Sequence, residues 1–219
     1  MPFVRSSLAA YAASALVFVH NAHKVVSSYL AQSIELEAVI TELLSLDALY
    51  HATVLNAPAR RASTAQGVAL LTLYSRGLSP ADSVRQTALV DQLKLLVRRG
   101  TTPGHLPICW AVLTAALGLP VDRTLHLHLF LYARGVVSAG IRLNALGPYA
   151  AQQLLLHEIR PLIEREIQLH DARMAKPEIL EGKETLEERV LATNPACTWP
   201  LGEILAARHD LQHSRIFNS

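Results

Sequence analysis

Apolar residues recur at helical spacing through the first quarter of the chain. One stripe holds Leu8, Ala12, Leu16, Val19, Val26 and Leu30. A second stripe, after a polar break, holds Leu36, Ile40, Leu43, Tyr50 and Val54. Because residues three, four and seven apart share one side of a helix, the pattern predicts two amphipathic helices here.

Capping and breaking residues predict where the helices begin and end. Ser33 should cap the second helix, and Pro58 suits the first turn of a third helix that ends at Arg76-Gly77. Ser79-Pro80-Ala81-Asp82 is a strong start signal, with serine as the cap and proline in the first turn. We therefore expect a fourth helix from this signal to about Arg99.

The second half continues the helical pattern. Pro107 can open a helix that ends near Gly118. Thr124 to Tyr132 alternates like a strand, but no second run could pair with it, so we favour helix. Pro161 should kink or restart the helix that carries Leu154 to Leu169. The fold class expected is an all-α, single-domain bundle of about eight to ten helices.

The composition changes beyond residue 170. We expect a helical core over residues 1–170, a flexible charged connector over 171–200, and a C-terminal docking segment over 201–219. Ile216 and Phe217 lie within the last four residues, where apolar side chains gain nothing unless they dock on another surface.

Composition favours a protein that meets other proteins. Only 17% of residues are charged, so more of the surface than usual should be apolar or uncharged. The net charge of +2, with scattered cations, argues against nucleic acid as a partner. Two separated cysteines indicate a reducing, cytoplasmic compartment. The uncharged stretch Ser6 to His23 contains polar residues, so it is interpreted as a core helix and no membrane partner is expected.

No set of reactive side chains demands a reaction. Gly135 to Gly140 has the spacing of a phosphate-binding loop, but Ile141-Arg142 stands where lysine and a hydroxyl residue are needed. The pairs His20 with His23 and His209 with His213 lack further ligands nearby. We therefore expect no catalytic residue, no resident metal and no cofactor.

Two alternatives stay open from the residues alone. One is a metal-dependent helical enzyme that uses His51, His105 or His157. The other is a helical protein bound to a membrane surface, although few cations flank its apolar helix faces. A separate oddity is Arg60 and Arg61 at a helix start, where cations oppose the macrodipole, so an acidic partner is expected for them.

Four blocks of the chain form a recognisable pattern. The first runs from Leu49-Tyr50-His51-Ala52 to Arg61-Ala62-Ser63-Thr64-Ala65-Gln66-Gly67, and the second begins at Gly104-His105-Leu106-Pro107. The third holds Val137-Ser138-Ala139, Arg142-Leu143 and Leu146-Gly147, and enters a helix with Gln153. The fourth holds Arg208-His209-Asp210, Gln212 and Ser214-Arg215-Ile216-Phe217. Together these blocks resemble the UreF family of urease accessory proteins.

The chain departs from the family pattern at several points. The family's opening glycine-rich segment is missing, so we interpret the chain as an N-terminally shortened member. Pro148 replaces a commoner glutamine, Asp210 replaces glutamate, and His213 replaces tyrosine, which alters an expected partner contact.

The resemblance implies an all-helical, dimeric, non-enzymatic scaffold. Proteins like UreF bind UreD or UreH and the GTPase UreG, and the assembly inserts nickel into apo-urease. By resemblance, the terminal block docks on UreD or UreH through Arg208, His209, Gln212, Arg215, Ile216 and Phe217. Arg142 and Gln153 are candidates for buried dimer or partner contacts.

Overall fold

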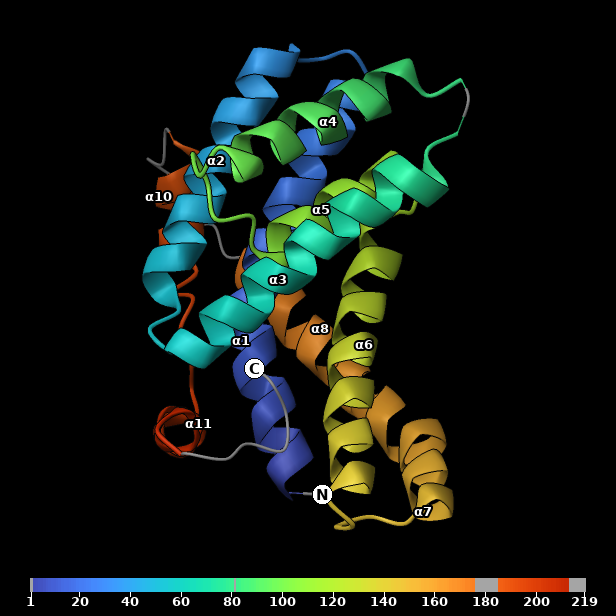
Figure 1. The fold of residues 1–219 in the computed structure, drawn as a ribbon, viewed down its shortest axis with the longest axis vertical. Coiled ribbons are helices and arrows are strands. Elements are labelled where there is room, and N and C mark those ends of the chain that lie inside the picture. The colour runs from blue at the N-terminus through green and yellow to red at the C-terminus, as the bar shows by residue number, and fades with distance from the viewer. Residues whose placement is uncertain (1, 81, 176–184, 213–219) are drawn as a thin grey trace.

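The long N-terminal stretch forms one helix, α1 (Pro2–Leu30), against which four others pack. These are α2 (Leu36–Thr53), α5 (Leu106–Ala116), α6 (Val121–Arg142) and α8 (Arg160–Met174). The computed structural model describes residues 2–80, 82–175 and 185–212 (Figure 1). Every regular element in those ranges is a helix, which confirms the all-α fold class.

Two shorter groups complete the bundle. α3 (Ala57–Leu73) continues into a π-helical turn, η1 (Tyr74–Leu78), and α4 (Val84–Arg98) packs beside both. At the other end, α7 (Pro148–Gln153) runs into a second π-helical turn, η2 (Leu154–Ile159), which leads into α8. Pro161 lies in the first turn of α8, so the helix restarts there as predicted.

α1 and α5 form the centre of the core. All residues of α5 except Leu106 are buried, because the helix is apolar on every side and α1, α3 and α6 cover it. By length and composition α1 could cross a membrane, but half of its apolar window is buried against neighbouring helices. The predicted stripe from Leu8 to Val26 faces this core, which confirms the expected core helix.

Several predicted helix signals are confirmed. Pro58 and Pro107 lie in the first turns of α3 and α5, and Gly118 ends α5 with a positive φ of 77°. The alternating segment Thr124 to Tyr132 lies within α6, so context outweighed the strand-like pattern. The glycine pair Gly135 and Gly140 also lies inside α6 and forms no loop.

The serine caps were predicted wrongly. The Ser33 backbone N–H bonds to the carbonyl of Ser28 and so closes the end of α1, while α2 begins at Leu36 without a side-chain cap. The Ser79 N–H likewise bonds to Tyr74 and closes η1, and α4 begins only at Val84. Both serines therefore close the preceding helix instead of capping the next one. Ala81 of the start signal lies outside the described residues.

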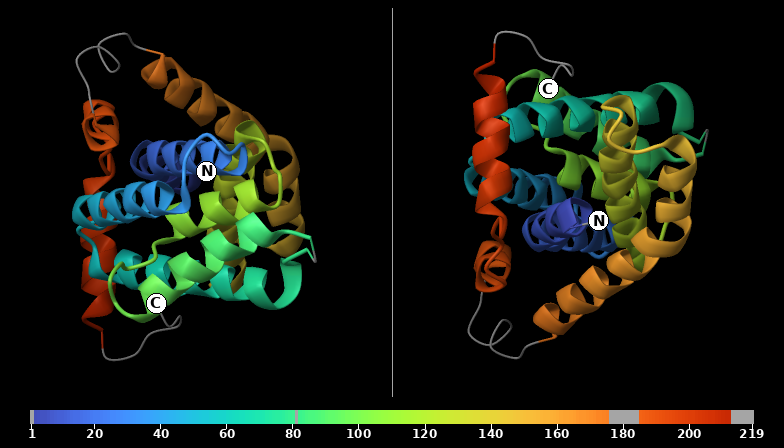
Figure 2. Two further views of the ribbon diagram at one scale, coloured as in Figure 1. Left: turned by 90° about the horizontal axis from the view of Figure 1, so that it is seen from above. Right: turned by 90° about the horizontal axis from the view of Figure 1, so that it is seen from below.

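Part of the expected connector is helical. α10 (Leu186–Ala192) begins with a capping box between Thr185 and Glu188, and its Val190 is fully buried against the core. The Ser45 hydroxyl of α2 donates to Glu187, which fixes the helix further. The division of the chain at residues 171 and 201 stays a prediction. α11 (Pro200–Asp210) follows on the outside of the bundle (Figures 1 and 2).

Candidate functional site

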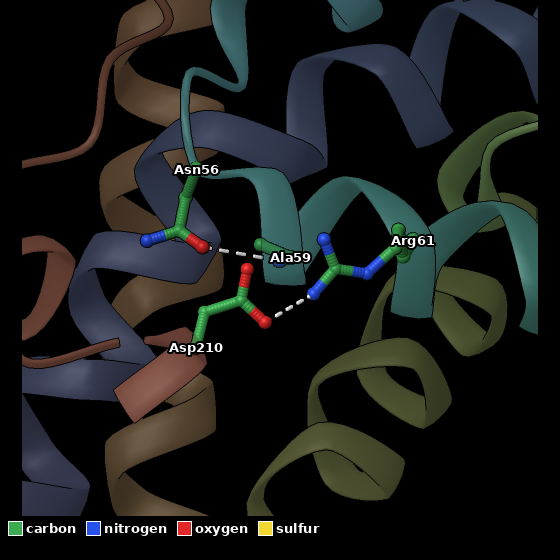
Figure 3. A network of polar contacts seen from close by, with 4 residues as sticks. All are labelled: Asn56, Ala59, Arg61 and Asp210. Carbon is green, nitrogen blue, oxygen red and sulfur yellow. Dashed lines mark hydrogen bonds and ion pairs between the residues drawn. The ribbon is translucent and has the colours of Figure 1, made fainter. Parts of the chain in front are cut away.

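Two polar contacts join α11 to the start of α3. The Arg61 guanidinium lies 2.6 Å from Oδ1 of Asp210, in the last turn of α11 (Figure 3). The Asn56 side chain caps α3 by accepting from the Ala59 N–H at 3.1 Å, and its amide donates to the Glu203 carbonyl at 3.1 Å. Asp210 is therefore the acidic partner of Arg61.

Arg60 has a different partner. Its Nε donates to the carbonyl of Val54, the residue that ends α2. A cation at the carboxyl end of a helix meets the negative end of the helix dipole, so this contact is favourable. The two arginines thus offset their unfavourable place at the start of α3 by binding the ends of two other helices.

The outer face of α11 is apolar and exposed. None of its residues is buried, and Leu201, Ile204 and Leu205 keep 60%, 57% and 52% of their surface accessible. Their spacing of three and four residues puts them on one face, and Arg208 extends the same face by another turn. We call these four residues the α11 ridge.

The other predicted site residues are scattered. His209 lies in the last turn of α11, and Gln212 is exposed just beyond it. Arg142 ends α6 and Gln153 ends α7, both exposed and on the side of the bundle away from α11 (Figure 2). Neither is buried within the chain. Three further predicted residues lie outside the described residues: Arg215, Ile216 and Phe217.

Beneath the α11 contact, α3 crosses the start of α5 at very short range. A Cβ on Gly67 would lie 2.1 Å from the carbonyl oxygen of Gly104 and 3.0 Å from Sγ of Cys109. Gly104 has a φ of +75°, and a Cβ there would meet the Val97 side chain at 2.8 Å. The crossing therefore needs glycine on both sides.

The Asp47 carboxyl group holds the loop before α5 from below. Asp47 is buried, and its oxygens accept from the Gly104 N–H at 2.7 Å and the His105 N–H at 2.9 Å. The Thr102 hydroxyl donates to the same carboxyl group. Three buried donors thus depend on one side chain, a feature that sequence reasoning missed.

A row of polar side chains links α2, α3 and α5 at this crossing. The Ser63 hydroxyl accepts from the Leu106 N–H at 3.1 Å and lies 3.1 Å from Nδ1 of His105. Nε2 of His105 lies 2.9 Å from Nδ1 of His51. Serine beside two histidines resembles a catalytic relay, but the hydroxyl oxygen here supplies a helix cap for α5.

Comparison with known proteins now decides the family. The UreF family model matches residues 2–158. The chain is 45% identical over 208 aligned residues to urease accessory protein 6 of Cryptococcus neoformans var. grubii. This alignment covers 84% of the chain and 66% of the relative. The chain belongs to the UreF family.

Other UreF-family relatives come from yeast and bacteria. A UreF-like urease accessory protein of Schizosaccharomyces pombe is 30% identical over 162 residues, covering 74% of this chain and 62% of the relative. UreF of Cereibacter sphaeroides is 32% identical over 155 residues, covering 68% of this chain and 65% of the relative. The chain spans slightly less than two thirds of the length of these relatives.

The fold explains two of the UreF-like blocks. Ser63 and Gly67, from the first block, meet Gly104 and His105, from the second, at the α3–α5 crossing. These residues hold the crossing together through a cap, a side-chain hydrogen bond and a close backbone approach. A side chain that is needed for packing can therefore carry a family resemblance without taking part in chemistry.

The histidines of the two predicted pairs have separate partners. Nε2 of His23 donates to the Leu119 carbonyl at 2.8 Å, whereas Nδ1 of His20 lies 3.2 Å from Nε2 of His170. Asp210 is engaged by Arg61, and His213 lies outside the described residues. In residues 2–80, 82–175 and 185–212, no three metal-binding side chains gather.

Acid should weaken the fold through its buried histidines. Burial lowers the pKa of His128 to about 3 and that of His170 to about 4, so both stay neutral when folded at neutral pH. In the unfolded chain, both histidines bind protons below about pH 6.5. The free energy of unfolding is therefore unaffected by these histidines above that pH and decreases as the pH falls below it. We expect a loss of about 1.4 kcal/mol per pH unit for each histidine between about pH 6 and 5, measured by urea unfolding.

A histidine substitution tests this cause. His128→Gln keeps a hydrogen-bonding group beside the Tyr11 hydroxyl, 2.9 Å from Nε2, but removes the titration. The free energy of unfolding of this variant should depend less steeply on pH than that of the unchanged protein. An identical slope in the two proteins would contradict the assignment.

Proposed function

We propose that this chain is a non-enzymatic scaffold and GTPase regulator in urease maturation. It joins a UreG-type GTPase to a UreD- or UreH-type protein, and the assembly inserts nickel into the urease apoprotein. We further propose that it works in the cytoplasm as a homodimer. Its UreF-family relatives are named urease accessory proteins, and these names support a role in urease maturation.

The α11 ridge is the observation that carries the proposal. A helix with no buried residue and three exposed aliphatic side chains on one face gains little from its own bundle. Arg208, within the ridge, and Gln212, just beyond α11, add polar groups beside the aliphatic side chains, as the rim of a protein interface requires. The ridge leads directly into Arg215, Ile216 and Phe217, so residues 201–219 are proposed as one docking segment for the UreD- or UreH-type partner.

A second contact region is proposed on the opposite side. Arg142 and Gln153 flank exposed apolar side chains, with Leu143 and Tyr149 keeping 49% and 89% of their surface accessible. Such a mixture of arginine, tyrosine and aliphatic groups is typical of interface centres. We assign this region to the second copy of the chain in the homodimer.

Charges on the α11 ridge should abolish partner capture. Ile204→Asp with Leu205→Asp is expected to lower co-purification with a co-expressed UreD- or UreH-type protein about tenfold or more, because carboxylates would be desolvated at the contact. Both side chains are exposed in the chain alone, so helical content by circular dichroism should not change. Val84→Asp, with 78% of the residue's surface exposed at the start of α4, is the matched control.

Deletion of residues 208–219 gives an independent test. It removes Arg208, His209, Gln212, Arg215, Ile216 and Phe217 together and should also abolish co-purification. Full retention of the partner by the deletion protein would refute the docking assignment, whatever the ridge variant does.

A further inference from the structure

The region formed by α3, η1 and α4 has a net positive charge. Residues 57–99 contain seven arginines and lysines but only two aspartates, while the whole chain has a net charge of +2. The rest of the chain is therefore net acidic. Such an imbalance gives this side of the molecule a positive field that acts on charged partners.

A groove opens on this side between α3 and α4. It has a volume of about 320 Å³ and is lined by Val68, Leu71, Thr72, Arg76, Lys94, Val97 and Arg98. Val68 and Val97 supply an apolar surface above the buried Leu71, and three cations supply the charge. The groove lies at the lower end of the size range of ligand-binding sites.

Among residues 2–80, 82–175 and 185–212, the three cations of the groove have no acidic partner. Lys94 and Arg98 are one turn apart on α4, and Arg76 comes from η1. In the described part of the chain, none of the three makes a salt bridge or a side-chain hydrogen bond. The nearby carboxylate of Asp91 is instead bonded by the Ser75 hydroxyl at 3.2 Å. Unpaired cations around an apolar groove favour a ligand with both negative charge and apolar groups.

The π-helical turn contributes to the groove. η1 continues α3 by one wide turn over Tyr74–Leu78, and this turn carries Arg76. Wide turns of this kind are rare and are found preferentially at functional sites. The groove is also separate from the α11 contact, which uses Asn56 and Arg61 at the other end of α3.

We propose that the α3–α4 groove binds an acidic, amphipathic segment of a partner protein. Aliphatic side chains of that segment contact Val68 and Val97, and its carboxylates pair with Arg76, Lys94 and Arg98. Recognition of this type combines a helix in an apolar groove with an acidic motif on a basic cluster. This site gives the scaffold a third protein contact, and it stands whether or not the α11 ridge binds its own partner.

A fluorescent peptide tests the site directly. The probe is a short amphipathic peptide with leucines on one face and glutamates on the other, titrated against the full chain by anisotropy. We expect saturable binding that weakens between about 50 mM and about 300 mM salt. Arg76→Glu with Lys94→Glu and Arg98→Glu should weaken binding about tenfold or more.

Matched controls separate this site from general charge. Arg123→Glu with Arg134→Glu and Arg165→Glu makes the same charge change at exposed positions of α6 and α8, and it should bind the peptide as before. Val68→Asp should weaken binding through the apolar surface. The ridge variant Ile204→Asp with Leu205→Asp should bind the peptide normally, so failure of one proposal is distinct from failure of the other.

Three outcomes would overturn the proposal. One is equal binding of a peptide with lysine in place of glutamate. Another is an equal loss of binding in both triple variants. The third is tighter binding of duplex DNA at the same salt, which would make the basic face a nucleic-acid surface. Circular dichroism of each variant confirms that a loss of binding is not a loss of fold.

Discussion

Asp47→Ala is expected to destabilise the protein by about 4 kcal/mol, close to the whole stability of many domains. The substitution leaves the Gly104 N–H, the His105 N–H and the Thr102 hydroxyl without their acceptor. Each buried donor without a partner costs about 1 to 3 kcal/mol. Urea unfolding monitored by circular dichroism measures the change.

Two variants show whether the acceptors are the cause. Asp47→Asn keeps the shape and one oxygen but places an amide N–H against a backbone N–H, so about half of the loss should remain. Asp91→Ala removes an exposed carboxyl group that accepts only from Ser75, and it should change stability by less than about 0.5 kcal/mol. A loss for Asp91→Ala as large as that for Asp47→Ala would exclude the proposed role of the buried acceptor.

Gly67→Ala is expected to cost about 3 kcal/mol by pushing α3 away from α5. The new methyl group would lie 2.1 Å from the Gly104 carbonyl oxygen, which is backbone and cannot rotate aside. Moving the helix would also loosen the Ser63 contact with the start of α5. Thermal unfolding should show a Tm lower by about 6 to 12 °C.

Gly135→Ala is the matched control for this prediction. Gly135 lies inside α6, and a Cβ there meets nothing within 4 Å. The same substitution should therefore stabilise the protein by about 0.5 to 1 kcal/mol through helix propensity. If Gly67→Ala melts at or above the temperature of the unchanged protein, the α3–α5 approach is not as close as described.

Periodicity predicted most of the helices because burial fixes which residues face inward. The α1 and α2 stripes follow from this periodicity, and the restart at Pro161 follows from the proline itself. The caps failed for a physical reason: Ser33 and Ser79 can end one helix or begin the next, and local sequence does not decide between these uses. α10 escaped prediction because it is one short, charged helix anchored by a single buried residue, Val190.

The candidate sites were only partly predictable. The unfavourable place of Arg61 at a helix start indicated an acidic partner, but the sequence could not name Asp210, which comes from a segment 149 residues away. The groove was missed because its cations lie on two elements, and only the packing of α3 beside α4 brings Arg76 to Lys94. Two glycines within blocks of family resemblance, Gly67 and Gly104, were the available signal for the crossing.

α11 is held mainly at its two ends. Trp199, at its start, meets the Phe3 ring edge to face at 4.9 Å, and Asp210, at its end, meets Arg61. An exposed ion pair contributes about 0 to 1 kcal/mol, and no residue of the helix is buried. Because α11 buries none of its own residues, we expect it to separate from the bundle at a small cost in free energy while the α1–α5 core stays intact.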